Sequence, residues 1–302
     1  MKLQGCGTAL ITPFKEDQSV DEKALRRLVE WQIDSGIHFL VPCGTTGETP
    51  TLSKAEWLRV IDITIETAGG RVPIVAGATS NSTADAIEKA KELGRRKGVD
   101  AILTASPYYN KPTQEGQFQH FKAIAEAVEK PLVLYSVQGR TGVNIEPATL
   151  GRLAKIPNII AVKEASGNIG QIAEVFSHVP ESFLVFSGDD AVTLPVISLG
   201  GVGIVSVASN EIPREMAEMT CAALSNDWKK AQAIQRKFVR LMQANFIESN
   251  PMPVKAVLAM MGRIEEVYRL PMVPMKKETR ARLQQVATEA GLLNGHAPVS
   301  DF

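Results

Sequence analysis

The chain has 302 residues, 44% of them hydrophobic, which excludes fibrous and disordered proteins. Lys and Arg together number 33, as do Asp and Glu, so no net charge would gather nucleic acid or an anionic membrane. A small-molecule partner is therefore favoured. The start carries no basic and apolar leader, and no stretch approaches the ~20 apolar residues of a membrane span, so we expect a cytoplasmic protein.

Short apolar runs rich in β-branched residues recur along the chain and predict eight strands. Amphipathic helical patterns separate them, as at 21–35 and 83–97. Eight βα units match a (β/α)8 TIM barrel better than an open doubly wound sheet, which usually has fewer strands and a nucleotide fingerprint. The predicted strands span 8–12, 39–41, 72–76, 101–104, 132–135, 159–162, 183–186 and 203–207.

The strand-like runs stop after about residue 210. We therefore predict a catalytic barrel over 1–225 and a C-terminal helical region over 226–302, with frayed residues after Gly291. The predicted helices of this last part of the chain span 214–224, 228–244, 253–261 and 277–290.

Neither a metal nor a cofactor is expected. Cys6, Cys43 and Cys221 are odd in number and far apart, which indicates reduced thiols and neither a disulfide framework nor a zinc site. HExxH, Walker A and EF-hand motifs are absent from the sequence.

Lys163 is the first candidate for chemistry, because it directly follows the apolar run 159–162. In a (β/α)8 barrel the active site lies at the carboxyl ends of the strands. An ammonium partly buried there has a lowered pKa and a fraction of free amine that can attack a carbonyl. A lysine at a strand end can also simply extend to water, so its role depends on the neighbouring strand ends.

Those strand ends carry suitable groups. Thr45 and Thr46 follow the second strand in a glycine-bounded loop, which could bind a carboxylate or could be a capped turn. Tyr109 follows the fourth strand, and Tyr135 and Arg140 belong to the end of the fifth, so two tyrosines are expected beside the amine. A phenol can transfer protons and a guanidinium suits a substrate carboxylate, although tyrosines often serve packing alone.

Two other motifs are interpreted as structural. Asp189 and Asp190 superficially offer the paired carboxylates of a glycosidase, but adjacent side chains point apart and N-capping is the commoner role at a strand-to-helix junction. The glycines within 200–203 precede a strand, so we expect a tight turn and no phosphate-binding loop.

Taken together, these residues resemble the dihydrodipicolinate synthase family, within the pyruvate-dependent class I aldolases that include N-acetylneuraminate lyase. The resemblance extends from Gly5 to about Leu293, and Arg140 in its Arg-Thr-Gly context favours the synthase over the rest of the superfamily. The residues that carry it are 44–48 (GTTGE), 108–112 (YYNKP), Tyr135, 140–142 (RTG), 163–167 (KEASG) and 250–255 (NPMPVK).

The resemblance implies a catalytic set. Lys163 would form an imine with pyruvate, and Tyr135 would assist as acid and base. Thr45 and Tyr109 would complete a proton relay, with Tyr109 reaching into the neighbouring subunit's site of a homotetramer. The imine would become an enamine that attacks the aldehyde, without any cofactor or metal.

The resemblance also implies the substrate contacts. Thr46 would hold the pyruvate carboxylate in a pocket that Gly188 and Val205 line. Arg140 would hold the carboxylate of L-aspartate 4-semialdehyde, a substrate of the diaminopimelate and lysine biosynthesis pathway.

The chain departs from the family pattern just before Arg140. Ser136, Gln138 and Gly139 stand where the family often has Asn, Pro and Ser, which predicts a looser loop. The acceptor aldehyde therefore stays open, and another pyruvate aldolase that acts on a sugar acid or a hydroxy-oxo acid is the alternative. A different class, a barrel hydrolase, would use carboxylates such as those of Asp189 and Glu164.

A second departure concerns regulation. Asn81 fits the family's lysine-binding pocket, but Lys54 lies in the loop that bears a histidine in the family. A cation at this position opposes a cationic effector, so we predict weak or absent inhibition by lysine.

Overall fold

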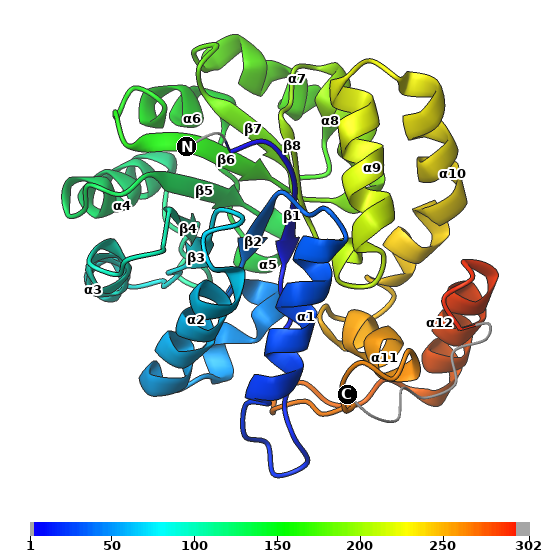
Figure 1. Ribbon diagram of the computed structural model, residues 1–302. Helices are drawn as coiled ribbons and strands as arrows, with labels where there is room; N and C mark the ends of the chain where they lie inside the picture. Colours follow the sequence, from blue (N-terminus) through cyan, green and yellow to red (C-terminus); the bar gives the residue numbers. More distant parts are fainter. Residues whose placement is uncertain (1–2, 294–302) are drawn as a thin grey trace.

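The computed structural model describes residues 3–293, and within them eight parallel strands form a closed inner layer surrounded by helices (Figure 1). The strands follow the order β2-β1-β8-β7-β6-β5-β4-β3, and an isolated parallel bridge between Leu40 and Ile74 closes the ring between β2 and β3. The predicted barrel is confirmed. The strands are β1 (Gly5–Ala9), β2 (Phe39–Val41), β3 (Val75–Gly77), β4 (Ala101–Ala105), β5 (Leu132–Ser136), β6 (Ile159–Glu164), β7 (Leu184–Ser187) and β8 (Gly203–Ser206).

Helices connect consecutive strands, and most begin at a residue whose side chain caps the first turn, such as Asp21, Ser53 and Ser82. The barrel helices are α1 (Glu22–Asp34), α2 (Lys54–Ala68), α3 (Thr83–Gly94), α4 (Gln114–Glu126), α5 (Gln138–Thr141), α6 (Pro147–Leu153), α7 (Ile169–His178), α8 (Thr193–Ser198) and α9 (Pro213–Leu224). Short 3-10 helices are η1 (Thr45–Gly47), η2 (Thr49–Thr51), η3 (Asp190–Val192) and η4 (Ala208–Asn210).

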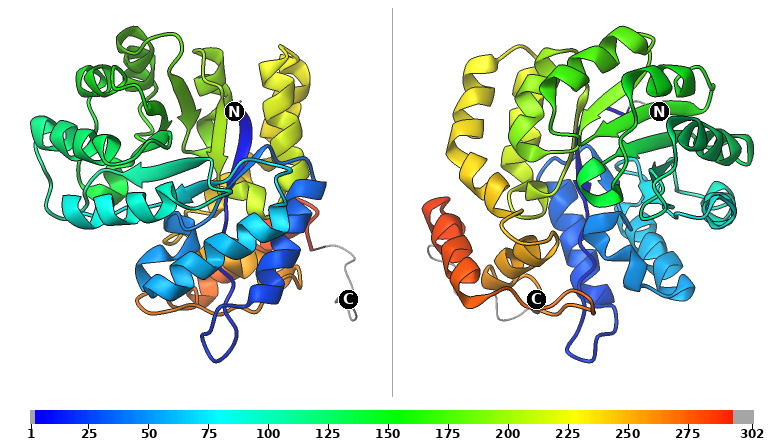
Figure 2. Two further views of the ribbon diagram at one scale, coloured as in Figure 1. Left: turned by 60° about the vertical axis from the view of Figure 1, so that its left-hand side comes forward. Right: turned by 180° about the vertical axis from the view of Figure 1, so that it is seen from behind.

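The C-terminal helices α10 (Trp228–Ala244), α11 (Met252–Met260) and α12 (Lys277–Glu289) follow the barrel, as predicted. Figure 2 shows α10 leading from the ring of helices to α11 and α12. α11 packs beside α1 through an apolar cluster that includes Leu28, Val254 and Leu258. The C-terminal region therefore contacts the first βα unit of the barrel, and residues 294–302, part of the segment predicted to fray, lie outside the described residues.

The prediction for the first strand is wrong, because β1 spans Gly5–Ala9 and not residues 8–12. Glycines are rare in strands, so the apolar run that follows looked more strand-like. In the barrel Gly7 pairs with Phe39, and a Cβ at Gly7 would lie 2.0 Å from the Phe39 ring. The glycine is required because the phenylalanine fills the barrel interior.

Two apolar layers hold the fold together. One lies between the strands and the helices, and the other fills the barrel, where Phe39 and Phe186 meet edge to face with ring centroids 5.4 Å apart. Tyr135 and Val205 belong to this inner layer. None of the helices within residues 3–293 has the length and apolar character needed to cross a membrane.

Candidate active site

Lys163 lies within β6 and not just beyond it, since the strand continues through Glu164. Alternation along the strand places Lys163 on the same face as Ala161, which belongs to the inner layer. Its side chain is 4% exposed, and Nζ lies 4.4 Å from the ring centroid of Tyr135, the residue paired with it across β5 and β6. The strand thus delivers an amine into the barrel beside a phenol.

Burial makes this amine reactive. It lowers the pKa of Lys163 from 10.5 to about 8; the negative charge of Asp190 opposes this change, and the positive charge of Arg140 adds to it. Burial also raises the pKa of Tyr135 to about 12, so the phenol keeps its proton near neutral pH. A partly deprotonated amine beside a protonated phenol suits nucleophilic attack on a carbonyl with proton transfer to its oxygen.

Gly188 makes room for the lysine. A Cβ at this position would lie 2.6 Å from the Cβ of Ala165 and 3.1 Å from Cε of Lys163. The backbone N–H of Gly188 also donates to the carbonyl of Glu164, at 2.7 Å. The absence of a side chain at Gly188 therefore leaves space along the lysine stem.

A cavity of about 420 Å³ opens next to this group, and residues from both the barrel and the C-terminal region line it. Its lining includes Tyr135, Arg140, Gly188, Phe246 and Asn250. The volume suits a small ligand, and the guanidinium of Arg140 offers a partner for a carboxylate.

The segment that carries Arg140 forms the short helix α5, despite the glycine at 139. The backbone N–H groups of Arg140 and Thr141 both donate to the carbonyl of Val137, and Nη2 of Arg140 donates to the carbonyl of Asn250 at 3.1 Å. Arg140 is thus held both at its backbone and at its guanidinium.

Thr46 lies in η1 and is 3% exposed, and its hydroxyl accepts a hydrogen bond from Nδ2 of Asn250 at 2.9 Å. The next residue, Gly47, is fixed through its carbonyl, which accepts from the hydroxyl of Thr12 at 2.7 Å. Thr45, by contrast, is exposed at the surface of the isolated chain.

A buried ion pair holds the end of this loop. Nζ of Lys255 lies 2.5 Å from Oε1 of Glu48, both side chains are essentially inaccessible to solvent, and the ammonium also lies over the rings of Phe14 and Tyr268. Burial lowers the pKa of Lys255, while the carboxylate of Glu48 raises it. Glu48 itself has a left-handed backbone (φ +50°), so the pair stabilises an unfavourable turn directly after Thr46 and Gly47.

The structure does not bring Tyr109 into this chain's own site. Its side chain is 87% exposed, so of the two predicted tyrosines Tyr135 alone borders the amine within one chain. Tyr109 also adopts φ +75°, a conformation rare outside glycine that is retained mainly where the surroundings require it. An exposed aromatic on a strained loop is compatible with a role at a neighbouring subunit.

The adjacent aspartates are structural, as predicted. Asp189 caps η3 through its bond from the backbone N–H of Ala191 at 2.9 Å. Asp190 is buried and accepts from the hydroxyl of Ser206 and from two backbone N–H groups at the start of η4. Glu164, the other carboxylate considered for a hydrolase, is tied to Ser166 and Gln171. These bonds leave no carboxylate pair arranged for hydrolysis among these three residues.

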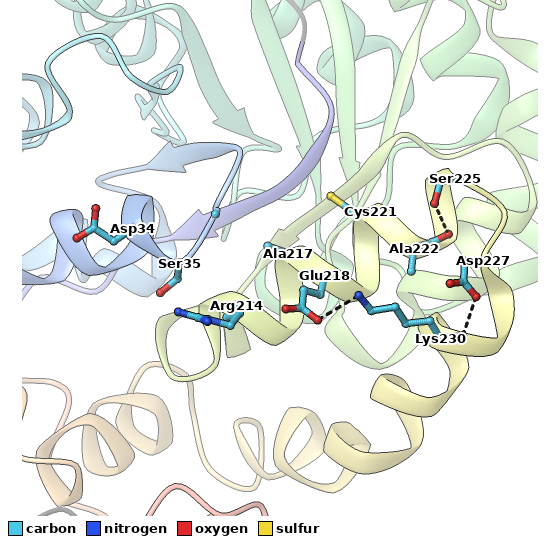
Figure 3. Close-up of a pocket in the computed structure, with 11 residues that line it drawn as sticks. Asp34, Ser35, Arg214, Ala217, Glu218, Cys221, Ala222, Ser225, Asp227 and Lys230 are labelled. Carbon is cyan, nitrogen blue, oxygen red and sulfur yellow. Dashed lines mark hydrogen bonds and ion pairs between the residues drawn. The ribbon is translucent and has the colours of Figure 1, made fainter.

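A larger depression of about 550 Å³ lies along α9 (Figure 3). Two of its charged groups form an ion pair, Lys230 and Glu218, at 3.3 Å. Cys221 lines it and contacts Nε2 of His38, which precedes β2, so the depression lies at the amino ends of the strands, away from Lys163. No cluster of three potential metal ligands occurs in residues 3–293.

Asn250 and Lys255 had no role in the sequence-based interpretation. Both stand in the segment 250–255 that contributed to the family resemblance, and this was the available signal. Their contacts with Thr46 and Glu48 connect residues more than 200 positions apart, which only the fold reveals.

The chain matches the Dihydrodipicolinate synthetase family over residues 2–290. It is 72% identical to a 4-hydroxy-tetrahydrodipicolinate synthase of Koribacter versatilis (strain Ellin345) over 97% of this chain and 98% of that relative, and 61% identical to one of Acidobacterium capsulatum over 97% of each. Its structure is similar to that of the synthase of Methylacidiphilum fumariolicum SolV, with a TM-score of 0.94, 42% identity and 96% of each chain covered. The synthase of Acinetobacter baumannii, solved in complex with pyruvate, gives a TM-score of 0.93 and 43% identity over 96% of this chain and 100% of that one. This chain therefore belongs to the dihydrodipicolinate synthetase family.

Proposed function

We propose that the protein is a lyase that condenses pyruvate with L-aspartate 4-semialdehyde to give 4-hydroxy-tetrahydrodipicolinate, in the diaminopimelate and lysine biosynthesis pathway. The observation that carries the proposal is the buried amine of Lys163, with a pKa of about 8, next to the phenol of Tyr135. The 72% identity to a curated synthase supports the choice of reaction.

The first half of the reaction activates pyruvate. The free amine of Lys163 attacks the carbonyl carbon of pyruvate, and Tyr135 donates a proton to the oxygen, which leaves as water when the imine forms. The imine then loses a proton from the pyruvate methyl group to the phenolate that Tyr135 became on donating its own, and the imine becomes an enamine. The low pKa of Lys163 matters here because only the unprotonated amine can attack.

The second half forms the new carbon–carbon bond. The enamine carbon attacks the aldehyde carbon, and the resulting alkoxide takes a proton, for which Tyr135 is again the nearest candidate. The amino group of the second substrate then attacks the imine carbon, which closes the ring and releases Lys163 as free amine. One water molecule leaves for each pair of substrates joined.

Each of the two substrates has its own carboxylate-binding group, a hydroxyl for pyruvate and a guanidinium for the aldehyde. Thr46 holds the pyruvate carboxylate, and Gly188 and Val205 shape the pocket around the methyl and carbonyl groups. Arg140 holds the carboxylate of the aldehyde substrate, which its place in the 420 Å³ cavity supports. A guanidinium fixed at both ends suits an acceptor that carries a carboxylate next to its amine.

The proton relay is completed between subunits in this proposal. Thr45 and Tyr109 connect Tyr135 to solvent, with Tyr109 supplied by the neighbouring chain of a cytoplasmic homotetramer. The 87% exposure of Tyr109 and its strained backbone support this role.

Borohydride reduction in the presence of pyruvate tests the proposal. We expect a stable mass increase on the peptide that bears Lys163, and its loss in Lys163→Ala. Turnover with aspartate semialdehyde but not with N-acetylmannosamine should identify the acceptor, and Arg140→Ala should weaken chiefly the use of that aldehyde. A wild-type protein without an adduct would disprove the imine mechanism, and equal turnover of both aldehydes would disprove the assigned acceptor.

A further inference from the structure

Asn250 occupies a junction between the two proposed carboxylate sites. It lies between α10 and α11, is 4% exposed and lines the 420 Å³ cavity. Its side-chain Nδ2 donates to the hydroxyl of Thr46 at 2.9 Å, and its backbone carbonyl accepts from Nη2 of Arg140 at 3.1 Å. One residue of the C-terminal region thus holds two groups from different strand ends of the barrel.

The bond to Thr46 determines where the hydroxyl proton can point. A hydroxyl has one proton and two acceptor positions, and the amide of Asn250 fills one acceptor position. Among residues 3–293, no protein group lies within hydrogen-bond distance to accept a bond from the Thr46 hydroxyl. The proton is therefore free for a ligand, and an acceptor-only group such as a carboxylate is the chemical match.

Apart from the bond to Thr46, the contacts of the described residues give the buried amide of Asn250 no other hydrogen-bonding role. Its Oδ1 is buried and has no hydrogen-bond partner in the described part of the chain, so the bond to Thr46 is the one that its side chain makes. Burying an amide with an unsatisfied oxygen costs free energy. A residue retained at this cost next to a hydroxyl proposed to bind the substrate is a candidate for a functional role.

We propose that Asn250 is a positioning residue, whose side-chain amide orients the Thr46 hydroxyl toward the carboxylate of the keto acid while its backbone carbonyl holds Arg140 for the second substrate. The inference rests on the proposed function. Because the two contacts use different parts of Asn250, a side-chain substitution disturbs the keto-acid site and leaves the bond to Arg140 available.

The rate of borohydride inactivation at increasing pyruvate concentration gives the half-saturating pyruvate concentration without any aldehyde. We expect Asn250→Ala to raise it about tenfold, the factor that corresponds to a weakened hydrogen bond to a charged group. Asn250→Leu, which keeps the volume, should do the same and guards against a variant that fails because of a void. The half-saturating concentration of the aldehyde should change less than about threefold in both.

A double-mutant cycle with Thr46→Val tests the route of the effect. If Asn250 acts through the hydroxyl, the double variant should be no more impaired for pyruvate than the more impaired single variant, about tenfold and not about a hundredfold. Asn245→Ala is the matched control, because Asn245 is also buried and also donates from Nδ2, but to Glu211 away from the cavity. It should leave the half-saturating pyruvate concentration within about twofold while it lowers stability.

The outcomes separate the two claims. A wild-type adduct on Lys163 together with unchanged pyruvate saturation in Asn250→Ala and Asn250→Leu overturns the inference and leaves the proposed function intact. Multiplying effects with Thr46→Val, or an equal effect of Asn245→Ala, overturn it as well. A wild-type protein that forms no adduct overturns the proposed function and the inference with it.

Discussion

Replacing Lys163 by methionine should make the folded protein more stable at neutral pH, although it removes the proposed nucleophile. Burial lowers the pKa of this lysine from 10.5 to about 8, which corresponds to about 3 kcal/mol of unfavourable free energy for the charged form. Methionine has a similar length and no charge to desolvate, so we expect the free energy of unfolding to rise by about 3 kcal/mol.

The stabilisation by Lys163→Met should shrink as the pH rises. Below about pH 8 the lysine is protonated in both states, so the cost of burying the charge is fully present in the folded wild type. Between about pH 8 and 10.5 the unfolded state binds more protons than the folded state, so wild-type stability rises with pH relative to the variant. The advantage of Lys163→Met should therefore be full at pH 7 and nearly lost at pH 10.5.

Urea unfolding of wild type and Lys163→Met at pH 7, 9 and 10.5, followed by circular dichroism, measures the difference directly. The comparison is made within each pH, so that the titration of other groups cancels. A variant that is equally or less stable at pH 7, or an advantage that does not shrink as the pH rises, would show that burial of the charge does not control the pKa.

Three further outcomes follow from the geometry. Gly188→Ala should slow borohydride trapping at Lys163 at least about tenfold, because its Cβ would lie 3.1 Å from Cε of the lysine, and unchanged trapping would show that the stem moves freely. Glu48→Gln should lower the free energy of unfolding by about 3–5 kcal/mol, since it leaves Lys255 charged and buried. The double variant Glu48→Leu with Lys255→Met should lower it by less, because no charge stays buried, and equal losses in urea unfolding would contradict this. Lysine should need more than ~1 mM for half-maximal inhibition of turnover, because the exposed ammonium of Lys54 belongs to the loop 50–57 that is expected to border the effector; sub-millimolar inhibition would refute it.

The sequence predicts the barrel and its reactive amine well because both depend on local patterns. The run before Lys163 is a strand whose alternation alone places the amine inside the barrel. The first strand is misplaced in the sequence-based prediction because Gly5 and Gly7 disfavour a strand locally, and the need for them appears only when His38 lies against Gly5 and Phe39 against Gly7. Strand propensity reflects the preference of a residue's own backbone, whereas the need for these glycines comes from side chains more than 30 residues away.

The parts of the site that sequence reasoning missed are those made by long-range contacts. The partners Asn250 and Thr46 are joined by a hydrogen bond across 204 positions, and no local periodicity connects them. The exposure of Tyr109 could not be derived either, because a tyrosine after a strand packs inward or outward according to the path of its loop. The looser segment expected before Arg140 forms a helical turn, since backbone bonds to Val137 do not require a particular side chain.

The division of the chain into a barrel over 1–225 and a helical region over 226–302 stays a prediction. Contacts between the two parts indicate that the candidate site depends on both. Asn250 holds Thr46, and Lys255 neutralises Glu48, so residues of the C-terminal region fix the loop after β2 at two points. A barrel without those residues would keep Lys163 in its strand but would leave the buried carboxylate of Glu48 without its counter-ion. The barrel supplies the proposed nucleophile, and the C-terminal region fixes the loop of Thr46, the residue proposed to hold the substrate carboxylate.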